Sequence, residues 1–217
     1  VRGPLTCKAL NIDKKLAVTD GALLLRYMPF NEEKKIFDYS YMPHWESSMK
    51  FDWKNLCESI GFHYIHPLNN IHSIIKEIRQ SKVLISEAMH GAIVADTFRV
   101  PWIPVRAYKG INGFKWNDWT LSMELQYNPI IIRSLYNNTT FTRKVIKEKI
   151  RYPYRKSTLS PFLNLYQQYQ KRYVLKPVIK NLEQIKKSKT YLSNDRILEL
   201  KGEKLLNTID QIKDKYQ

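Results

Sequence analysis

Hydrophobic positions along the first 130 residues occur in short runs that alternate with longer amphipathic segments. The clearest unit lies between Val83 and Val105, where two apolar runs flank a segment of helical character. Two adjacent parallel strands need a crossover connection, and a helix provides it. We therefore predict a βαβ unit, with a strand at residues 83–85, a polar turn at 86–87, a helix at 88–98 and a second strand at 102–105.

The same alternation continues before and after this unit. The segment after Asn70 is the strongest helix candidate, because isoleucines at positions 71, 74, 75 and 78 fall on one helical face. Helices are expected at residues 4–10, 53–60, 71–80 and 116–125, and strands at 15–19, 36–42 and 62–65, while residues 129–132 suit either an edge strand or a buried turn. Strands and helices that alternate with short links predict an α/β fold, a doubly wound parallel sheet with helices on both faces.

Charge and helix pattern divide the chain into two parts. From Phe141 onward, 19 Lys or Arg residues stand against 7 Asp or Glu residues, so this part carries +12 of the net charge of +16. Amphipathic helices separated by prolines are expected there at residues 144–150, 163–173, 178–189 and 196–215. We therefore expect an α/β domain at residues 1–139 and a basic, mainly helical extension at residues 140–217.

Composition excludes several classes of protein. No apolar stretch reaches the roughly 18 residues that a membrane span requires. Cys7 and Cys57 are too few for a disulfide framework and match no zinc-ligand spacing, so we expect a reducing, cytoplasmic environment and no metal. Gly91, Gly110 and Gly113 lack the strand–loop–helix arrangement of a dinucleotide fingerprint, and no nicotinamide cofactor is expected.

His90 is the most informative single residue, because it falls in the first turn of the helix predicted at residues 88–98. Ligands of open α/β sheets bind beyond the carboxyl ends of the strands, where helix N-termini present unpaired N–H groups to anions. A small phosphorylated or carboxylated substrate is therefore expected beside His90. The alternative is that His90 caps or packs at the top of the helix, with Gly91 allowing close contact between helix and sheet.

Four motifs, taken in order, carry a family resemblance. They are Val1-Arg2-Gly3-Pro4-Leu5-Thr6, Thr19-Asp20-Gly21-Ala22-Leu23-Leu24, Met42-Pro43-His44 and Ser86-Glu87-Ala88-Met89-His90-Gly91-Ala92-Ile93-Val94-Ala95-Asp96. Over roughly residues 1–125 the chain resembles the polysaccharide pyruvyl transferase family. The resemblance implies a two-lobed fold like that of the GT-B glycosyltransferases, in which this chain is the Rossmann-like second lobe. Because Val1 already belongs to the first motif, we expect the chain to be the later part of a longer protein.

The resemblance also implies a reaction in exopolysaccharide or cell-surface glycan biosynthesis. A pyruvyl group passes from phosphoenolpyruvate to two hydroxyls of a saccharide or lipid-linked saccharide, which gives a cyclic ketal and phosphate without a cofactor. His90 falls at the family's essential histidine, and Arg2 falls at its Arg-Gly or Arg-Asp position, which is associated with donor binding.

The chemistry of the side chains gives the catalytic candidates. Histidine can serve as an acid or base near working pH. A helix N-terminus by itself favours the neutral ring, and Glu87, three residues earlier, could counter this by facing His90. The alternative for Glu87 is the ordinary preference of acidic residues for a first helical turn.

Four residues are candidates for substrate binding. Arg2 offers a planar fork suited to a carboxylate or phosphate. Arg106 follows the strand at residues 102–105, Lys115 lies in a loop that could fold over the site, and His44 follows Pro43 at another strand end. The alternatives are solvated surface charge for the three cations and a backbone-bonded turn for His44.

Three other residues have weaker support. Trp116 and Trp119 fall on one helical face and could stack on a sugar ring, although packing against the sheet is the commoner arrangement. Asp20 with Gly21 is predicted to form a turn in which the carboxylate bonds backbone amides.

Two other functions remain open from the sequence. A GT-B glycosyltransferase with a nucleotide-sugar donor would use the same strand ends, with Glu87 binding the sugar nucleotide. Alternatively, the extension could bind nucleic acid or an anionic membrane through a basic, tyrosine-containing stretch at residues 143–156. Interspersed acidic residues favour a solvated helix face, so nucleic acid is not expected, while weak contact with the inner face of a membrane stays open.

Overall fold

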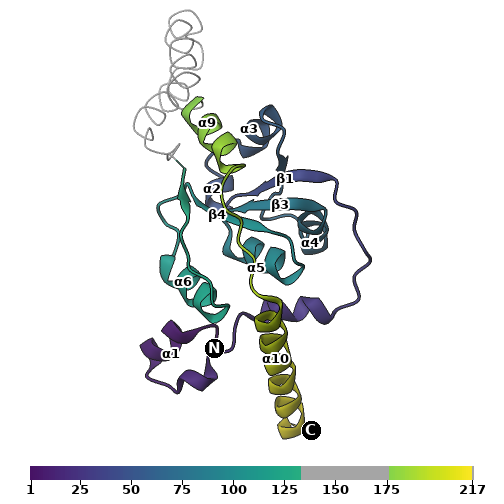
Figure 1. Cartoon of the computed structure of the whole chain (residues 1–217), viewed down its shortest axis with the longest axis vertical. Coiled ribbons are helices and arrows are strands. Elements are labelled where there is room, and N and C mark those ends of the chain that lie inside the picture. The colour runs from purple at the N-terminus through teal and green to yellow at the C-terminus, as the bar shows by residue number, and fades with distance from the viewer. Residues whose placement is uncertain (133–175, 217) are drawn as a thin grey trace, which may run out of the picture.

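A five-stranded, all-parallel sheet forms the centre of the computed structural model, which describes residues 1–132 and 176–216 (Figure 1). The strands are β1 Phe37–Met42, β2 His63–Tyr64, β3 Ser81–Ser86, β4 Trp102–Arg106 and β5 Ile130–Ile131. Their spatial order is β2-β1-β3-β4-β5, and each neighbouring pair is parallel. The predicted α/β class with a parallel sheet is therefore confirmed.

The helical segments include two 3-10 helices, η1 and η2. They are α1 Pro4–Leu10, η1 Lys14–Leu16, η2 Gly21–Tyr27, α2 Trp45–Ser48, α3 Trp53–Ser59, α4 Ile71–Arg79, α5 Met89–Thr97, α6 Gly113–Ser122, α9 Lys176–Ile185 and α10 Asp195–Tyr216. The helix predicted at residues 116–125 begins earlier, because the side chain of Asn112 caps the amide of Lys115. It ends where Glu124 adopts a left-handed φ of 58°.

The strand predicted at residues 15–19 is wrong. This segment begins as the 3-10 turn η1, in which the Asp13 carboxylate accepts the Lys15 amide. Backbone bonds then join it to the first residue of the chain, from Val18 N to Val1 O at 3.0 Å and from the Val1 amino group to Leu16 O at 2.9 Å. The local pairing satisfies the backbone polar groups of this segment without a place in the sheet.

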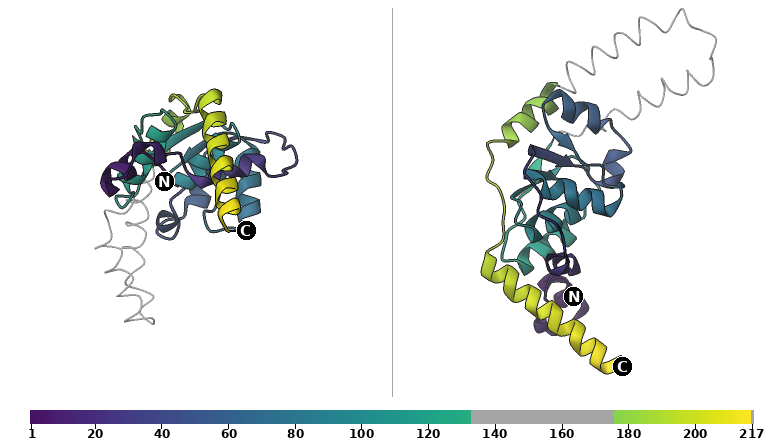
Figure 2. Two further views of the ribbon diagram at one scale, coloured as in Figure 1. Left: turned by 90° about the horizontal axis from the view of Figure 1, so that it is seen from below. Right: turned by 90° about the vertical axis from the view of Figure 1, so that its right-hand side faces the viewer.

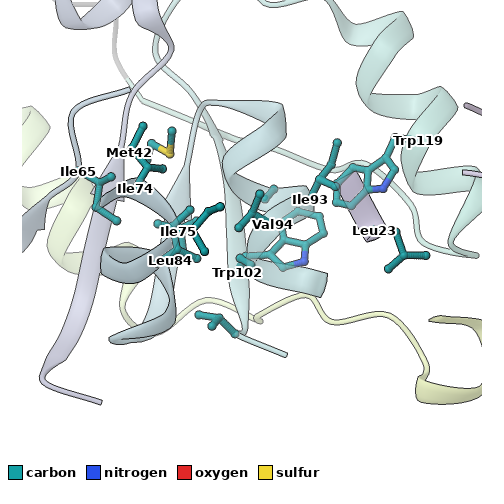
Figure 3. Packing of buried hydrophobic residues seen from close by; sticks show 14 of the residues in the cluster. Leu23, Met42, Ile65, Ile74, Ile75, Leu84, Ile93, Val94, Trp102 and Trp119 are labelled. Carbon is teal, nitrogen blue, oxygen red and sulfur yellow. The ribbon is translucent and has the colours of Figure 1, made fainter. Parts of the chain in front are cut away.

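One face of the sheet packs against α4, α5 and α6. Figure 3 shows Leu84 of β3, Trp102 of β4 and Ile93 of α5 meeting in this cluster. Trp116 and Trp119 of α6 complete it and are each only 2% exposed. They therefore pack against the sheet beside Trp102, with ring centroids 6.2 and 5.3 Å from its ring, which is the commoner of the two expected arrangements.

The opposite face is covered by α3 and α9. Successive residues of a strand point to opposite faces, and Ile85 accordingly joins Tyr41 and Ile103 in a second cluster. Val178, Leu182 and Ile185 of α9 are buried in the same cluster. A helix from the C-terminal extension therefore completes the core, as expected for a sheet with helices on both faces.

A buried carboxylate holds the start of α10 against the sheet. Asp96 of α5 accepts hydrogen bonds from the Ser193 amide at 2.8 Å, from the Ser193 hydroxyl and from the indole of Trp102 at 3.1 Å. Leu198 is buried in the first cluster, and α10 then projects beyond the sheet (Figure 2).

The extension is described only in part. The helices predicted at residues 178–189 and 196–215 are confirmed as α9 and α10, whereas those at 144–150 and 163–173, the basic stretch at 143–156 and the boundary at 139/140 lie outside the described residues. Among the helices that the structure describes, none is long and apolar enough to cross a membrane.

Candidate functional site

The site lies where the order of the strands reverses. The chain passes from β1 to β2 on one side and returns to β3 on the other, so the connections that follow β1 and β3 diverge, and this is where open α/β sheets bind ligands. Met42 and Ser86, the last residues of the two strands, are register partners. A pocket of about 500 Å³ opens beyond them. It is lined by Met42, His44, Trp45, Glu46, Pro67, Leu68, Ala88, Met89, His90, Gly110, Ile111, Asn112, Lys115 and Trp116.

The first turn of α5 supplies one wall of this pocket. Ala88 is the N-cap residue, and no side chain caps the helix, so the amides of the first turn have no side-chain acceptor at their cap. Such amides carry positive potential and favour an anion. His90 projects from this turn with 67% of its side chain exposed. The expected place of His90, at a helix start beside a ligand-sized pocket, is observed.

Glu87 takes a different place from the one expected. Its carboxylate is fully buried: Oε1 accepts the backbone amides of Ala107, at 2.8 Å, and Tyr108, and Oε2 accepts the backbone amide of His44 at 3.1 Å. One side chain thus joins the chain segments that follow β1, β3 and β4. In this position both oxygens of Glu87 are engaged by backbone amides, and Glu87 braces the segments around the pocket.

Removing the charge of Glu87 should destabilise these three segments. We expect Glu87→Gln to lower the free energy of unfolding by about 2–3 kcal/mol, because its amide group would turn a donor toward donor N–H groups. Denaturant unfolding measures this, and Glu58→Gln, at a side chain that is 58% exposed, is the matched control, expected to change stability by less than about 0.5 kcal/mol. Equal stability of the two variants would contradict the bracing role.

The carboxylate that approaches His90 belongs to Asp20. Its Oδ2 lies 3.8 Å from His90 Nε2 and 2.9 Å from Arg2 Nε, while Oδ1 accepts the Ala22 amide at 3.0 Å. The side chain of Asp20 is only 11% exposed. Asp20 therefore links Arg2 to His90. The predicted turn accounts for Oδ1, which accepts the Ala22 amide, and not for the contacts of Oδ2.

Arg2 is held by contacts of its own motif with α6. Asp118 Oδ1 accepts the amides of Leu5 and Thr6 at 2.8 and 3.0 Å, and its Oδ2 accepts the Thr6 hydroxyl. A Cβ on Gly3 would lie 2.0 Å from the Asp118 carbonyl oxygen, so only glycine allows this approach. The first motif is thus a docking element that fixes Arg2 beside Asp20.

The other predicted binding residues divide into two groups. His44 and Lys115 line the pocket, whereas Arg106 is exposed at the end of β4 and is not among the lining residues. The His44 ring stacks on Tyr108 with centroids 5.8 Å apart, and its Nδ1 is buried without a hydrogen-bond partner among the described residues. Burial lowers the pKa of His44, which favours a neutral ring.

The sequence did not predict the link through Asp20, nor that Trp45, Glu46 and Leu68 would line the pocket. The sequence predicted only a turn at Asp20 and Gly21. A turn accounts for one carboxylate oxygen of Asp20 and does not predict what the other oxygen contacts. Within residues 1–132 and 176–216, no three His, Cys, Asp or Glu side chains gather as a metal site would require.

Comparison with known proteins bears on the part of the chain that builds this site. The family model described as polysaccharide pyruvyl transferase matches residues 1–108. The succinoglycan biosynthesis protein ExoV of Rhizobium meliloti (strain 1021) is 41% identical over 130 residues, which are 59% of this chain and 41% of the relative. The chain thus spans about two fifths of the length of that relative. No solved structure gives a significant match.

The matched segment includes Arg2, Asp20, His44, Glu87 and His90, and therefore most of the residues that the geometry brings together. The fold, the four ordered motifs and the family match agree over the same residues. Through residues 1–108, the chain belongs to the polysaccharide pyruvyl transferase family.

Proposed function

We propose that this chain provides the donor-binding part of a pyruvyl transferase, which moves a pyruvyl group from phosphoenolpyruvate to sugar hydroxyls during exopolysaccharide or cell-surface glycan biosynthesis. The observation that carries the proposal is the position of His90. It projects from an uncapped helix N-terminus into a pocket at the reversal of strand order, with Asp20 and Arg2 behind it.

The reaction needs two proton movements. The methylene carbon of phosphoenolpyruvate takes one proton and becomes the methyl group, while the adjacent carbon gains cationic character and bonds to two sugar oxygens. The two sugar hydroxyls lose one proton each, so one proton goes to the methyl group and the other leaves with phosphate. A single histidine can deliver the first proton and recover one from a hydroxyl.

The residues of the site fit these tasks. His90 is the acid and base, and the Asp20 carboxylate lies beside its ring, with Oδ2 3.8 Å from Nε2. The amides of the first turn of α5 and the ammonium group of Lys115 attract the phosphate and carboxylate of the donor. Arg2 orients Asp20, and Arg106 would bind the donor from the edge of the site. Glu87 is a positioning residue.

The acceptor contacts, the location and the membrane contact of the protein would involve more than the described residues. A GT-B-like arrangement, with a second lobe that faces this pocket, would supply the remaining contacts to the acceptor. A cytoplasmic location suits phosphoenolpyruvate as donor. Contact of the basic extension with an anionic membrane would bring the site close to lipid-linked saccharides, and it is supported by the charge of +12 after residue 140.

Donor binding can be tested on this chain by thermal shift. Phosphoenolpyruvate at about 100 times its dissociation constant would stabilise the fold by about 2.7 kcal/mol, which raises Tm by several degrees. UDP-glucose, the probe for a nucleotide-sugar donor, should raise Tm by less than about one degree. Stabilisation by UDP-glucose and not by phosphoenolpyruvate would favour the glycosyltransferase and overturn the proposal.

A further inference from the structure

Trp45 differs from the other tryptophans of the chain. Four of the five are at most 2% exposed, whereas Trp45 is 46% exposed. It opens α2, directly after β1, and lines the pocket. Leu68, from the segment between β2 and α4, lines the same pocket and is 59% exposed. An open apolar surface therefore forms part of a pocket that also contains His90.

Glu46 places a carboxylate beside this surface. The Tyr108 hydroxyl donates to its Oε2, and Lys50 Nζ approaches the same oxygen at 3.4 Å. Among the described residues no hydrogen bond reaches Oε1, so this oxygen remains available as an acceptor. The hydrogen bond from Tyr108, followed by the ammonium of Lys50, holds the pKa of Glu46 below its usual value, and the group stays ionised.

This pairing selects for one kind of ligand. A pyranose ring presents an apolar C–H face to an aromatic plane and hydroxyl donors at its edge to a carboxylate. An anion would be repelled by Glu46, and a wholly apolar ligand would cover its Oε1 without offering a hydrogen-bond donor. The donor therefore belongs with His90 and Lys115, away from Glu46.

The pocket is larger than the donor alone requires. Its volume of about 500 Å³ falls within the range of roughly 300–1,000 Å³ that small-molecule sites span. Phosphoenolpyruvate, a three-carbon ester, would fill only part of it. We infer that Trp45, Leu68 and Glu46 form the acceptor subsite, where a pyranose ring stacks on Trp45 and donates a hydroxyl to Glu46. The inference rests on the proposed function, of which it names the acceptor-binding residues.

Saturation-transfer NMR on this chain tests the subsite, with methyl β-D-glucopyranoside, methyl β-D-galactopyranoside and methyl β-D-mannopyranoside as probes. At least one probe should receive saturation, strongest at its ring C–H protons. Trp45→Ala should weaken its binding about threefold to tenfold, and Glu46→Gln should weaken it without removing it. Phe114→Ala is the matched control, because Phe114 is 50% exposed on α6 and does not line the pocket.

The outcomes separate this inference from the proposed function. Binding of phosphoenolpyruvate, followed by thermal shift, should be unchanged in Trp45→Ala. If none of the probes receives saturation from the unmodified chain, or if Trp45→Ala binds them as the control does, the subsite is overturned while donor binding stands. If pyranosides bind through Trp45 and phosphoenolpyruvate does not bind, the proposed function fails and the saccharide subsite remains.

Discussion

Substitution of His90 by glutamine is expected to lower the turnover of pyruvyl transfer by about 10²–10⁴-fold. Glutamine keeps the polarity and approximate length of the side chain but cannot exchange a proton near neutral pH. Because 67% of the His90 side chain is exposed, the substitution should leave the fold intact. Binding of phosphoenolpyruvate should weaken only a few-fold, since the helix amides and Lys115 remain.

The measurement is phosphate release from phosphoenolpyruvate in the presence of a saccharide acceptor, and the ketal methyl signal in NMR is a second readout. The assay uses a full-length protein that contains this chain. His72→Gln, at an exposed position on α4 that lies outside the pocket lining, is the control and should retain full turnover. If His90→Gln retains more than about a tenth of the turnover, His90 is not the proton donor.

Gly3→Ala is expected to have the largest structural effect. The new Cβ would lie 2.0 Å from the backbone carbonyl oxygen of Asp118 and 2.5 Å from its carboxylate. A backbone carbonyl cannot rotate away as the end of a flexible side chain can. The first motif would have to move away from α6, at a cost of about 3 kcal/mol or more. The contacts from Asp118 to Leu5 and Thr6 would be lost, and Arg2 would no longer be fixed beside Asp20.

Denaturant unfolding measures the stability of this variant, and thermal shift measures its binding of phosphoenolpyruvate. Gly113→Ala is the matched control, because an added Cβ there meets nothing within 4 Å and alanine favours the helix. We expect it to be neutral or stabilising by up to about 1 kcal/mol. A stability of Gly3→Ala equal to that of the control would show that the first motif does not dock on α6 in this way.

The predictions that came from local pattern were the most successful. The isoleucines after Asn70 predicted α4, and the Asn70 side chain caps the His72 amide at 2.9 Å as expected for a helix start. The βαβ unit around α5 was found with shifts of only a residue or two at its ends. Capping and helical periodicity depend on residues within one turn of each other, so the sequence contains all that is needed to place them.

The segment at residues 15–19 shows what local pattern does not encode. Its pattern suited a strand, but a strand needs a partner in the sheet, and the segment pairs with Val1 instead. The tryptophans of α6 are a second example. Their spacing placed them on one face, and only the packing of Trp102 against them decided that this face is buried.

The sequence by itself determined the class of fold, the place of His90 at a helix start and the family, because each depends on residues close together in the chain or on motifs in order. Only the tertiary structure decided that Asp20 approaches His90, and that Glu87 braces three segments. It also decided that Asp118 holds a motif more than a hundred residues away. Such contacts join residues from different strand ends, and the order of strands in the sheet, which local periodicity does not encode, brings those ends together.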